Sequence, residues 1–586
     1  MTVTTMSTPL HDRVRVQFAK VHLWHWIVLA LLILVVATPL SFLVLGSLSN
    51  VSIPTEFDLT RLSFDNYARV WSDPGTYRVM TNTLIYVSGA TVVGISVATI
   101  LAWLTERTNI RGKVLIYVGI PMTLAMPGML QAMAYVLLLS PRIGFLNKLM
   151  APLGLGPINI YSLGGMMFIE GIRLVPTAFL MLVPLLRSMD PSLEEAAAMS
   201  GAPPHSSLRK VTMRLMLPGL LAVMIYQFMT ALEAFEVPGI LGLPASTYVF
   251  STKIYSILQI ADGVPAYGDA NALAMVYVLI AISATWLYAR VIARSEQFSI
   301  ITGKGYRPRE ADLGRWSWCA LLLVSLFLVF AIVLPFLVLL YVSFLGFLQV
   351  PSAAAFRSMT FGYYRELIEN PLIAQVLWNT LLMVAITSTL TVAISFSVSL
   401  IVVRSKFWGR RLLDQLVFLP HAIPGIVMGL AFLWVFLRAN KLGIPIHGGV
   451  LAISLAFTVS FIAYGTRAMN AAILQIHKDL EEAAQVSGAP YWRTMWRIFV
   501  PLMLPTFVGV WIWTMLHAIR IAGTPLLLYE GNENQVLSVL IWSMWDSGEI
   551  QGVGAIGVLM ILVLFVMIML LRIVGFGRGS HVQGAK

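Results

Sequence analysis

Residues 194–203 are Glu-Glu-Ala-Ala-Ala-Met-Ser-Gly-Ala-Pro, and residues 481–490 are Glu-Glu-Ala-Ala-Gln-Val-Ser-Gly-Ala-Pro. These two signatures are identical at eight of ten positions, at an offset of 287 residues (481 minus 194). Each is part of a short polar stretch between long apolar segments. Because a polar motif repeated on one side of a membrane protein is expected to contact something there, the signatures organise the interpretation of the whole chain.

The composition is that of a membrane protein with many spans. Of the 586 residues, 58% are hydrophobic and only 11% are charged, which is too few charges for a soluble chain. The net charge of +12 does not indicate nucleic-acid binding, because Lys and Arg are dispersed through short loops. The single cysteine, Cys319, excludes an internal disulfide and a cysteine-based metal site.

Twelve apolar runs are long enough to cross a bilayer, which takes about 20 residues. We expect them near residues 24–46, 81–104, 114–139, 161–186, 214–237, 270–292, 317–346, 376–403, 411–437, 449–473, 500–524 and 552–575. With the N-terminus in the cytoplasm, most Lys and Arg residues fall inside, as the positive-inside rule requires. The sequence therefore predicts an all-α membrane protein of about twelve transmembrane helices, with both termini and both signatures in the cytoplasm.

The repeat extends beyond the signatures and predicts two homologous six-helix halves in parallel orientation, packed about a pseudo-two-fold axis. At an offset of 297, the repeated pieces are residues 62–67 and 359–364, 82–84 and 379–381, and 127–128 and 424–425. The offset then falls to 287, so we expect about ten extra first-half residues in an outer loop near 141–160. The predicted division is a first half at 1–294 (core about 78–292), a cytoplasmic linker at 295–315, and a second half at 316–586 (core about 375–575).

Each signature has the pattern of a helical hairpin outside the membrane. Asp190 and Pro191, followed by two glutamates, are typical of a helix start. Gly201 permits a sharp turn, and Pro203 cannot continue the helical hydrogen bonds. The second copy repeats this order. A hairpin that only caps the bundle is the alternative, but two near-identical copies argue against it.

The signatures resemble the Glu-Ala-Ala loop in permease subunits of binding-protein-dependent ABC importers of the type I fold. The motif residues are Glu194, Glu195, Ala196, Ala197 and Gly201 in the first copy and Glu481, Glu482, Ala483, Ala484 and Gly488 in the second. Downstream, the second copy has the expected Ile498 and Pro501, whereas the first has Val211 and Arg214 instead. The fused two-half form is most similar to the ferric iron uptake permease family.

The resemblance implies a bacterial inner-membrane transport subunit that is not an enzyme and holds no cofactor. The two loops would dock on two copies of a cytoplasmic ABC ATPase, which binds ATP and Mg, and a periplasmic binding protein would deliver the substrate. Glu195 and Glu482 would pin the loops, and Gly201 and Gly488 would make their turns. Consistent with a separate ATPase, the chain has no phosphate-binding Gly-x-x-x-x-Gly-Lys-Ser/Thr sequence.

Ionisable residues inside predicted spans are candidates for the translocation path, because buried charge in a membrane is costly. The candidates are Glu233, Glu236, His517 and Arg520. Glu233 aligns with Arg520 at offset 287, so we expect an ion pair between the halves, with a purely structural pair as the alternative. We place Glu236 on the same helix face as Glu233, whereas Glu170 and Arg173 are spaced to pair with each other. No dense group of carboxylates, His or Cys predicts a metal site or a catalytic constellation.

Ferric iron is the substrate that the resemblance favours. Residues 235–238 and 302–308 resemble the ferric iron uptake group. Importers of thiamine, aminoethylphosphonate or polyamines share the architecture and remain alternatives. A twelve-span secondary transporter driven by an ion gradient is a rival of another class, as is a receptor that kept the fold without transporting.

Overall fold

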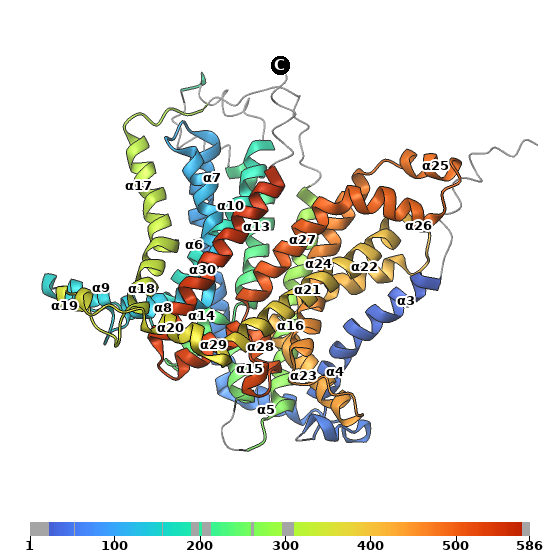
Figure 1. Cartoon of the computed structure of the whole chain (residues 1–586), viewed down its shortest axis with the longest axis horizontal. Helices are drawn as coiled ribbons and strands as arrows, with labels where there is room; N and C mark the ends of the chain where they lie inside the picture. Colours follow the sequence, from blue (N-terminus) through green and yellow to red (C-terminus); the bar gives the residue numbers. More distant parts are fainter. Residues whose placement is uncertain are drawn as a thin grey trace, which may run out of the picture. The chain divides into compact units, whose positions relative to one another are not determined.

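The fold is helical throughout the part of the chain that the structure describes. The computed structural model describes residues 23–51, 53–154, 156–188, 199–201, 213–259, 263–295 and 310–576. These residues form helices joined by loops, with three isolated bridges and no named strand (Figure 1). The all-α prediction is confirmed.

Helices account for every predicted span. Nine single membrane-length helices occur in the described residues: Leu23–Ser47 (α3, η1 and α4), Pro74–Arg107 (α6), Leu163–Ser188 (α10), Tyr267–Ser295 (α16), Trp316–Ser343 (α17, η8 and α18), Pro371–Arg404 (α21), Val450–Gln475 (α24), Tyr491–Arg520 (α26, η10 and α27) and Ile550–Phe576 (α30). The other three are bent pairs: Lys113–Met122 with Gly128–Leu139 (α7, α8), Met213–Glu233 with Glu236–Gly242 (α13, α14), and Arg410–Phe418 with Gly425–Lys441 (α22, α23). Shorter helices include Asp65–Ser72 (α5), Phe145–Met150 (α9), Phe250–Leu258 (α15), Ala353–Arg357 (α19), Gly362–Glu369 (α20), Asp479–Val486 (α25), Gly523–Leu528 (α28) and Leu537–Asp546 (α29).

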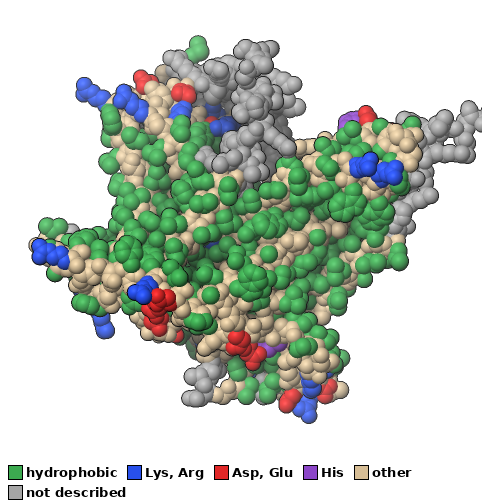
Figure 2. Space-filling view, in the orientation of Figure 1, with side chains coloured by type: hydrophobic (Ala, Val, Ile, Leu, Met, Phe, Trp, Pro, Cys, Tyr) green, Lys and Arg blue, Asp and Glu red, His purple; other side chains and the backbone are tan. Residues whose placement is uncertain are grey.

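The outer surfaces of these helices suit a lipid environment. Hydrophobic side chains cover the middle of the helices on the face drawn in Figure 2, whereas charged side chains gather near helix ends. Leu34, Leu322 and Val566 are each more than half exposed. Water would disfavour so much exposed apolar surface, but the hydrocarbon of a bilayer accepts it.

Repeated proline–glycine pairs break one helix in each half. Pro127 precedes α8 in an extended conformation, and Pro424 does the same before α23. Proline fixes its own backbone and removes a hydrogen-bond donor, so it disfavours continuation of the helix on its N-terminal side. The axes of the first pair differ by 93°. The sequence predicted one span at 114–139 and one at 411–437, and the structure has a sharp bend in each.

Hydrogen bonds at equivalent positions show the repeat in three dimensions. The hydroxyl of Thr83 in α6 accepts a bond of 3.0 Å from the backbone N–H of Phe250. Thr380 in α21 accepts one of 2.8 Å from Leu537. The two pairs are related by the offsets 297 and 287 that the sequence shows, so the homologous halves make the same local contacts.

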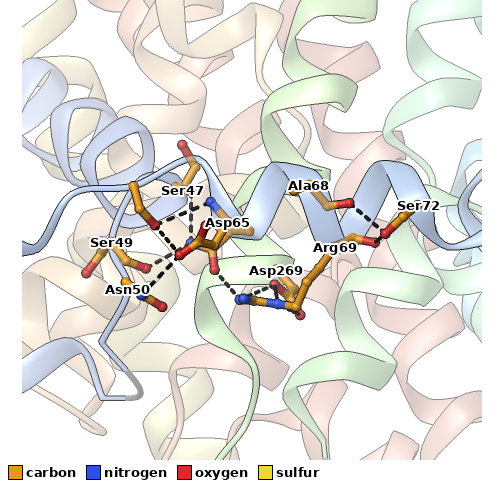
Figure 3. Close-up of polar contacts among 10 residues, drawn as sticks. Ser47, Ser49, Asn50, Asp65, Ala68, Arg69, Ser72 and Asp269 are labelled. Carbon is orange, nitrogen blue, oxygen red and sulfur yellow. Dashed lines mark hydrogen bonds and ion pairs between the residues drawn. The ribbon is translucent and has the colours of Figure 1, made fainter.

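A polar network fastens α5 to its surroundings (Figure 3). The amide of Asn66 donates to the carbonyl oxygens of Ser47 and Ser49 at 2.9 and 2.8 Å. Arg69 forms an ion pair with Asp269 at 2.8 Å, which connects α5 to the start of α16. The network therefore anchors the amphipathic α5 at the end of a membrane helix.

The described residues form two compact units that do not follow chain order. One unit comprises residues within 1–46, 375–537 and 567–586, and the other comprises residues within 47–374 and 538–566. In the first unit, His25 of α3 packs against Phe407. In the second, Gln131 and Tyr135 of α8 donate to carbonyl oxygens of the π-helical segment Val329–Val333 (η8). The division of the chain into two halves joined by a linker at 295–315 was predicted from the sequence repeat and not from contacts. That division stays a prediction.

Candidate functional site

The second signature forms a helix-turn-helix between two membrane helices. Its first helix is α25, its second is Tyr491–Thr494 (α26), and the π-helical Met495–Phe499 (η10) leads into α27 (Figure 1). Asp479, Glu481 and Glu482 occupy the first turn of α25, where carboxylates favour the positive end of the helix dipole. The hairpin that the sequence pattern predicts is therefore present in this copy.

Glycine occupies the turn position of both signatures. Gly488 has φ +73° and Gly201 has φ +77°. This left-handed conformation costs an L-residue about 1–2 kcal/mol, whereas glycine adopts it freely. Among the described residues, a Cβ at either position would contact nothing within 4 Å, so backbone conformation and not space favours glycine there.

The remaining predicted residues of the first signature cannot be placed. Glu194, Glu195, Ala196 and Ala197 lie outside the described residues. Their roles in docking stay predictions, as do those of Ala483 and Ala484 in the second copy.

A buried ion pair fastens the second signature to the membrane helix α21. Arg404, the last residue of α21, lies 3.0 Å from Glu481, and their side chains are 6% and 8% exposed. Arg404 also donates to the carbonyl oxygens of Ile473 and Ile476 at the end of α24. Burial raises the pKa of the Glu481 carboxyl, and the Arg404 guanidinium opposes that rise. Glu481 is thus the acid that contacts this membrane helix, whereas the pinning role of the half-buried Glu482 stays a prediction.

An equivalent arginine occupies the first half. Arg107 ends α6, is 4% exposed, and donates to the carbonyl oxygen of Leu186 at 3.0 Å. Arg107 and Leu186 align with Arg404 and Ile473 at offsets 297 and 287. Sequence reasoning missed both arginines, although a basic residue at the end of a predicted span in each half was a usable signal.

The path candidates Glu233 and Glu236 flank a helix break. Glu233 is the half-buried last residue of α13, and Glu236 is the 9% exposed first residue of α14. The helix is interrupted between them and bends by 53°. The prediction that they share one continuous helix face is therefore wrong, because the i, i+3 relation requires an unbroken helix.

Charged groups from several helices surround these two carboxylates. Arg173 in α10 binds both carboxylate oxygens of Glu170, at 2.6 and 3.0 Å, and Glu170 is fully buried. The expected Glu170–Arg173 pair is therefore confirmed. Arg173 also interacts electrostatically with Glu236 and with Glu233, so the four ionisable groups form one cluster.

His517 and Arg520 lie near the end of α27, in the other compact unit. His517 stacks on Trp513 with ring centres 3.9 Å apart, and Trp513 stacks on Tyr464 at 3.6 Å. Arg520 is the last residue of α27, where a cation favours the helix dipole. A break follows before α28, at the position equivalent to the break after Glu233. The ion pair of Glu233 with Arg520 stays a prediction.

The described residues contain no group of three or more His, Cys, Asp and Glu side chains that could hold a metal ion. The predicted absence of catalytic and cofactor residues also stays a prediction.

The sequence profile of one protein family matches the chain in two places. The family is described as the inner membrane component of binding-protein-dependent transport systems, and the matches cover residues 90–297 and 392–575. Each match includes one signature. The two segments together cover more than half of the chain.

Individual relatives are similar at low identity, and the two ferric transport proteins among them align over most of the chain. The ferric transport system permease protein FbpB of Actinobacillus pleuropneumoniae is 24% identical over 80% of this chain and 67% of its own length. The Fe(3+)-transport system permease protein FbpB 2 of Haemophilus influenzae is 22% identical over 88% and 92%. The sulfate transport system permease protein CysT of Escherichia coli is 28% identical over only 26% of this chain and 57% of its own.

A solved structure of a bacterial ABC transporter that imports the acidic polysaccharide alginate also matches. Its chain is 17% identical, and the match covers 44% of this chain and 94% of that one, with a TM-score of 0.35. At that TM-score the likeness says nothing further about this chain.

Proposed function

The chain belongs to the family of binding-protein-dependent transport system inner membrane components, and we propose that it is the permease of an ATP-driven importer of ferric iron. It is a multi-pass membrane protein with two homologous halves. The proposal adds three features: two copies of a cytoplasmic ATPase, a periplasmic binding protein, and termini on the cytoplasmic side.

The geometry of the second signature is the observation that carries the ATP-driven mechanism. A short helical hairpin turns at Gly488, and the buried Arg404–Glu481 pair ties it to α21. Movement of a docked ATPase would therefore reach a membrane helix through a short contact. ATP binding would close the two ATPases and open the helices outward to receive substrate, and hydrolysis would reset them.

Coverage of the relatives supports ferric iron over the other substrates. The two ferric transport relatives align over 80% and 88% of the chain, so each alignment includes parts of both halves. The alignment with the sulfate relative spans about a quarter of the chain. Importers of thiamine, aminoethylphosphonate or polyamines remain the alternatives, with no observation that favours any of them.

Uptake by intact cells tests the proposal. Cells that lack the chain and cells that regain it from a plasmid are given radiolabelled ferric iron, thiamine, an aminoalkylphosphonate or a polyamine. We expect the plasmid to restore uptake of ferric iron alone, and ATP depletion to abolish that uptake. Restored uptake of another compound would overturn the substrate. Uptake that survives ATP depletion but stops when the ion gradient collapses would indicate a secondary transporter instead.

A further inference from the structure

Two segments that are distant in the sequence form a shelf beside the end of α18. The first is residues 142–153, which include α9 and the 3-10 helix Ala151–Leu153 (η5). The second is residues 346–357, which include α19. Both segments belong to the same compact unit. Figure 1 shows α9 and α19 extending sideways beyond α17, across the direction of the membrane helices.

Aromatic contacts and hydrogen bonds hold the shelf in a fixed conformation. Phe145 in α9 and Phe356 in α19 both pack on Tyr341 near the end of α18, with ring centres 5.7 and 5.8 Å from that of Tyr341. The buried amide of Asn147 donates to the carbonyl oxygens of Leu139 and Ile158, both at 2.9 Å. These bonds fix α9 between α8 and the segment that precedes α10. The shelf is therefore a folded structure.

The shelf exposes large apolar side chains. The four that are most exposed, at 58–74%, are Leu149, Leu153, Phe347 and Phe356. Figure 2 shows hydrophobic side chains over this part of the surface, with Lys or Arg at its free end. Apolar side chains grouped on a folded surface mark a contact with another protein or with a membrane.

The charge of the shelf favours lipid as the partner. The shelf contains Arg142, Lys148 and Arg357 and no Asp or Glu. By contrast, residues 529–549, which are also outside in the predicted topology, contain four acidic residues and no Lys or Arg. Outer segments are expected to be poor in basic residues, so three of them without an acid call for an anionic partner. Lipid phosphates supply that charge, and a surface of apolar and basic side chains is typical of segments that lie in the membrane interface.

The position of the shelf in the chain agrees with this partner. Residues 142–153 lie between α8 and α10, and the opposite end of α10 leads to the first signature. The proposed function places that signature in the cytoplasm, so the shelf lies at the outer surface of the membrane. Because it extends sideways past a membrane helix, the lipids of the outer leaflet lie within its reach.

We propose that the shelf binds the outer leaflet of the bilayer, with its four exposed apolar side chains among the acyl chains and its three basic side chains on lipid phosphates. The inference rests on the proposed function, which sets the orientation. Through Asn147, the membrane surface then holds the outer end of α10, whose other end leads to the first signature. In the described residues, no helix lies between α23 and α24 at the equivalent place of the second half. The anchor at α9 therefore belongs to the first half.

Spin labels measure where the shelf lies. Cys319 is the only cysteine of the chain, so Cys319→Ala is a background for single cysteines. Leu149→Cys and Phe356→Cys report on the shelf. Leu322→Cys on the exposed face of α17 is the lipid control, and Glu56→Cys, at an exposed position of the same compact unit, is the water control.

The labelled full-length chain is reconstituted in vesicles of phosphatidylcholine and phosphatidylglycerol. Each label is tested for access to oxygen, which concentrates in lipid, and to a nickel chelate, which stays in water. We expect oxygen access to exceed nickel access at both shelf positions, as at Leu322→Cys, and the reverse at Glu56→Cys. Nickel access equal to that of Glu56→Cys would overturn the lipid contact, whether or not added binding protein then shields the labels. Low access to both reagents would also overturn it, since protein and not lipid would then cover the shelf.

Reversal of charge tests the contact with phosphates. Lys148→Glu with Arg357→Glu should raise nickel access at Leu149→Cys, because the reversed charges repel lipid phosphates. Unchanged access would overturn the role of the basic side chains.

A separate measurement checks the orientation that the proposal borrows. In right-side-out membrane vesicles, a thiol reagent that cannot cross the membrane should react with Glu56→Cys. Failure to react would overturn the orientation in the proposed function, whereas the reagent access of the shelf labels tests the lipid contact itself.

Discussion

The two halves pack equivalent helices against each other by different means. In the first half, α6 and α10 approach closely at glycines: a Cβ on Gly94 would lie 2.9 Å from the carbonyl oxygen of Gly171. In the second half, hydroxyl groups of α21 donate to carbonyl oxygens of α24, from Ser395 to Ile462 at 3.3 Å and from Ser399 to Thr466 at 3.2 Å. Both devices are typical of membrane helices, where apolar burial alone does not drive association.

This difference teaches that the duplicated fold depends on small residues along one helix face and not on particular side chains. The contacts at the helix ends near the signatures vary less. Arg107 and Arg404 end equivalent helices and donate to equivalent carbonyl oxygens. The two halves therefore differ more in how their membrane helices pack than in the contacts at the helix ends near the signatures.

The largest expected effect is at the glycine contact of the first half. Gly94→Leu places a side chain where even a Cβ overlaps the backbone of α10. We therefore expect the free energy of unfolding to fall by about 3 kcal/mol or more, which would leave little folded protein. The measurement is the yield and thermal stability of protein purified in detergent. Gly164→Ala is the control on α10, because its Cβ would meet only the Ser162 hydroxyl, at 3.8 Å. Normal yield of Gly94→Leu would contradict the close approach.

Breaking the Arg404–Glu481 pair should have the next largest effect. Arg404→Ala leaves a buried carboxylate without its partner, which costs about 3–5 kcal/mol. We expect the hairpin to become open to protease and stimulated ATP hydrolysis to fall. The double variant Arg404→Ala with Glu481→Ala should be milder than the single one, because no charge is then left buried alone. A double variant as defective as Arg404→Ala would show that the pair itself does not hold the hairpin.

Substitution of the turn glycines should impair coupling with a smaller effect on stability. Gly488→Asp forces an L-residue into a positive φ, at a cost of about 1–2 kcal/mol, and we expect uptake to be lost while the protein stays folded. Gly488→Asn should retain more uptake, since asparagine tolerates this conformation and adds no charge to the turn. Parallel substitutions at Gly201 would show whether the two signatures contribute equally. Full uptake by Gly488→Asp would contradict the coupling role.

The smallest expected effect belongs to the hydroxyl contacts of the second half. Ser395→Ala removes one interhelical hydrogen bond, and such bonds contribute about 0.6 kcal/mol on average in a membrane. We expect a barely lowered thermal stability and unchanged uptake. A loss as large as that of Gly94→Leu would show that the two halves do not pack by different means.

Hydropathy and repetition predicted most of the fold, because membrane-length apolar runs leave little choice of secondary structure. The offsets 297 and 287 also predicted which residues occupy equivalent places, such as Thr83 and Thr380. The breaks at Pro127 and Pro424 were missed, since a span with an internal proline can either bend or stay straight. The signature hairpin was predicted from its capping residues and its glycine, which act locally.

The side-chain partners at the site could not be predicted in the same way. Glu481 contacts Arg404 across a gap of 77 residues (481 minus 404), and no local pattern specifies such a pairing. Glu233 and Glu236 were identified together from the sequence. Their placement on one helix face was wrong because it assumed an unbroken helix, whereas the helix breaks between them.

ATP hydrolysis by the reconstituted complex tests the central claim most directly. The chain, its ATPase and the binding protein are assembled in proteoliposomes, and hydrolysis is compared with and without ferric iron on the binding protein. The account predicts stimulation by the loaded binding protein, abolished by Gly488→Asp in an intact complex. Equal hydrolysis with loaded and unloaded binding protein, in a complex shown to be assembled, would contradict it.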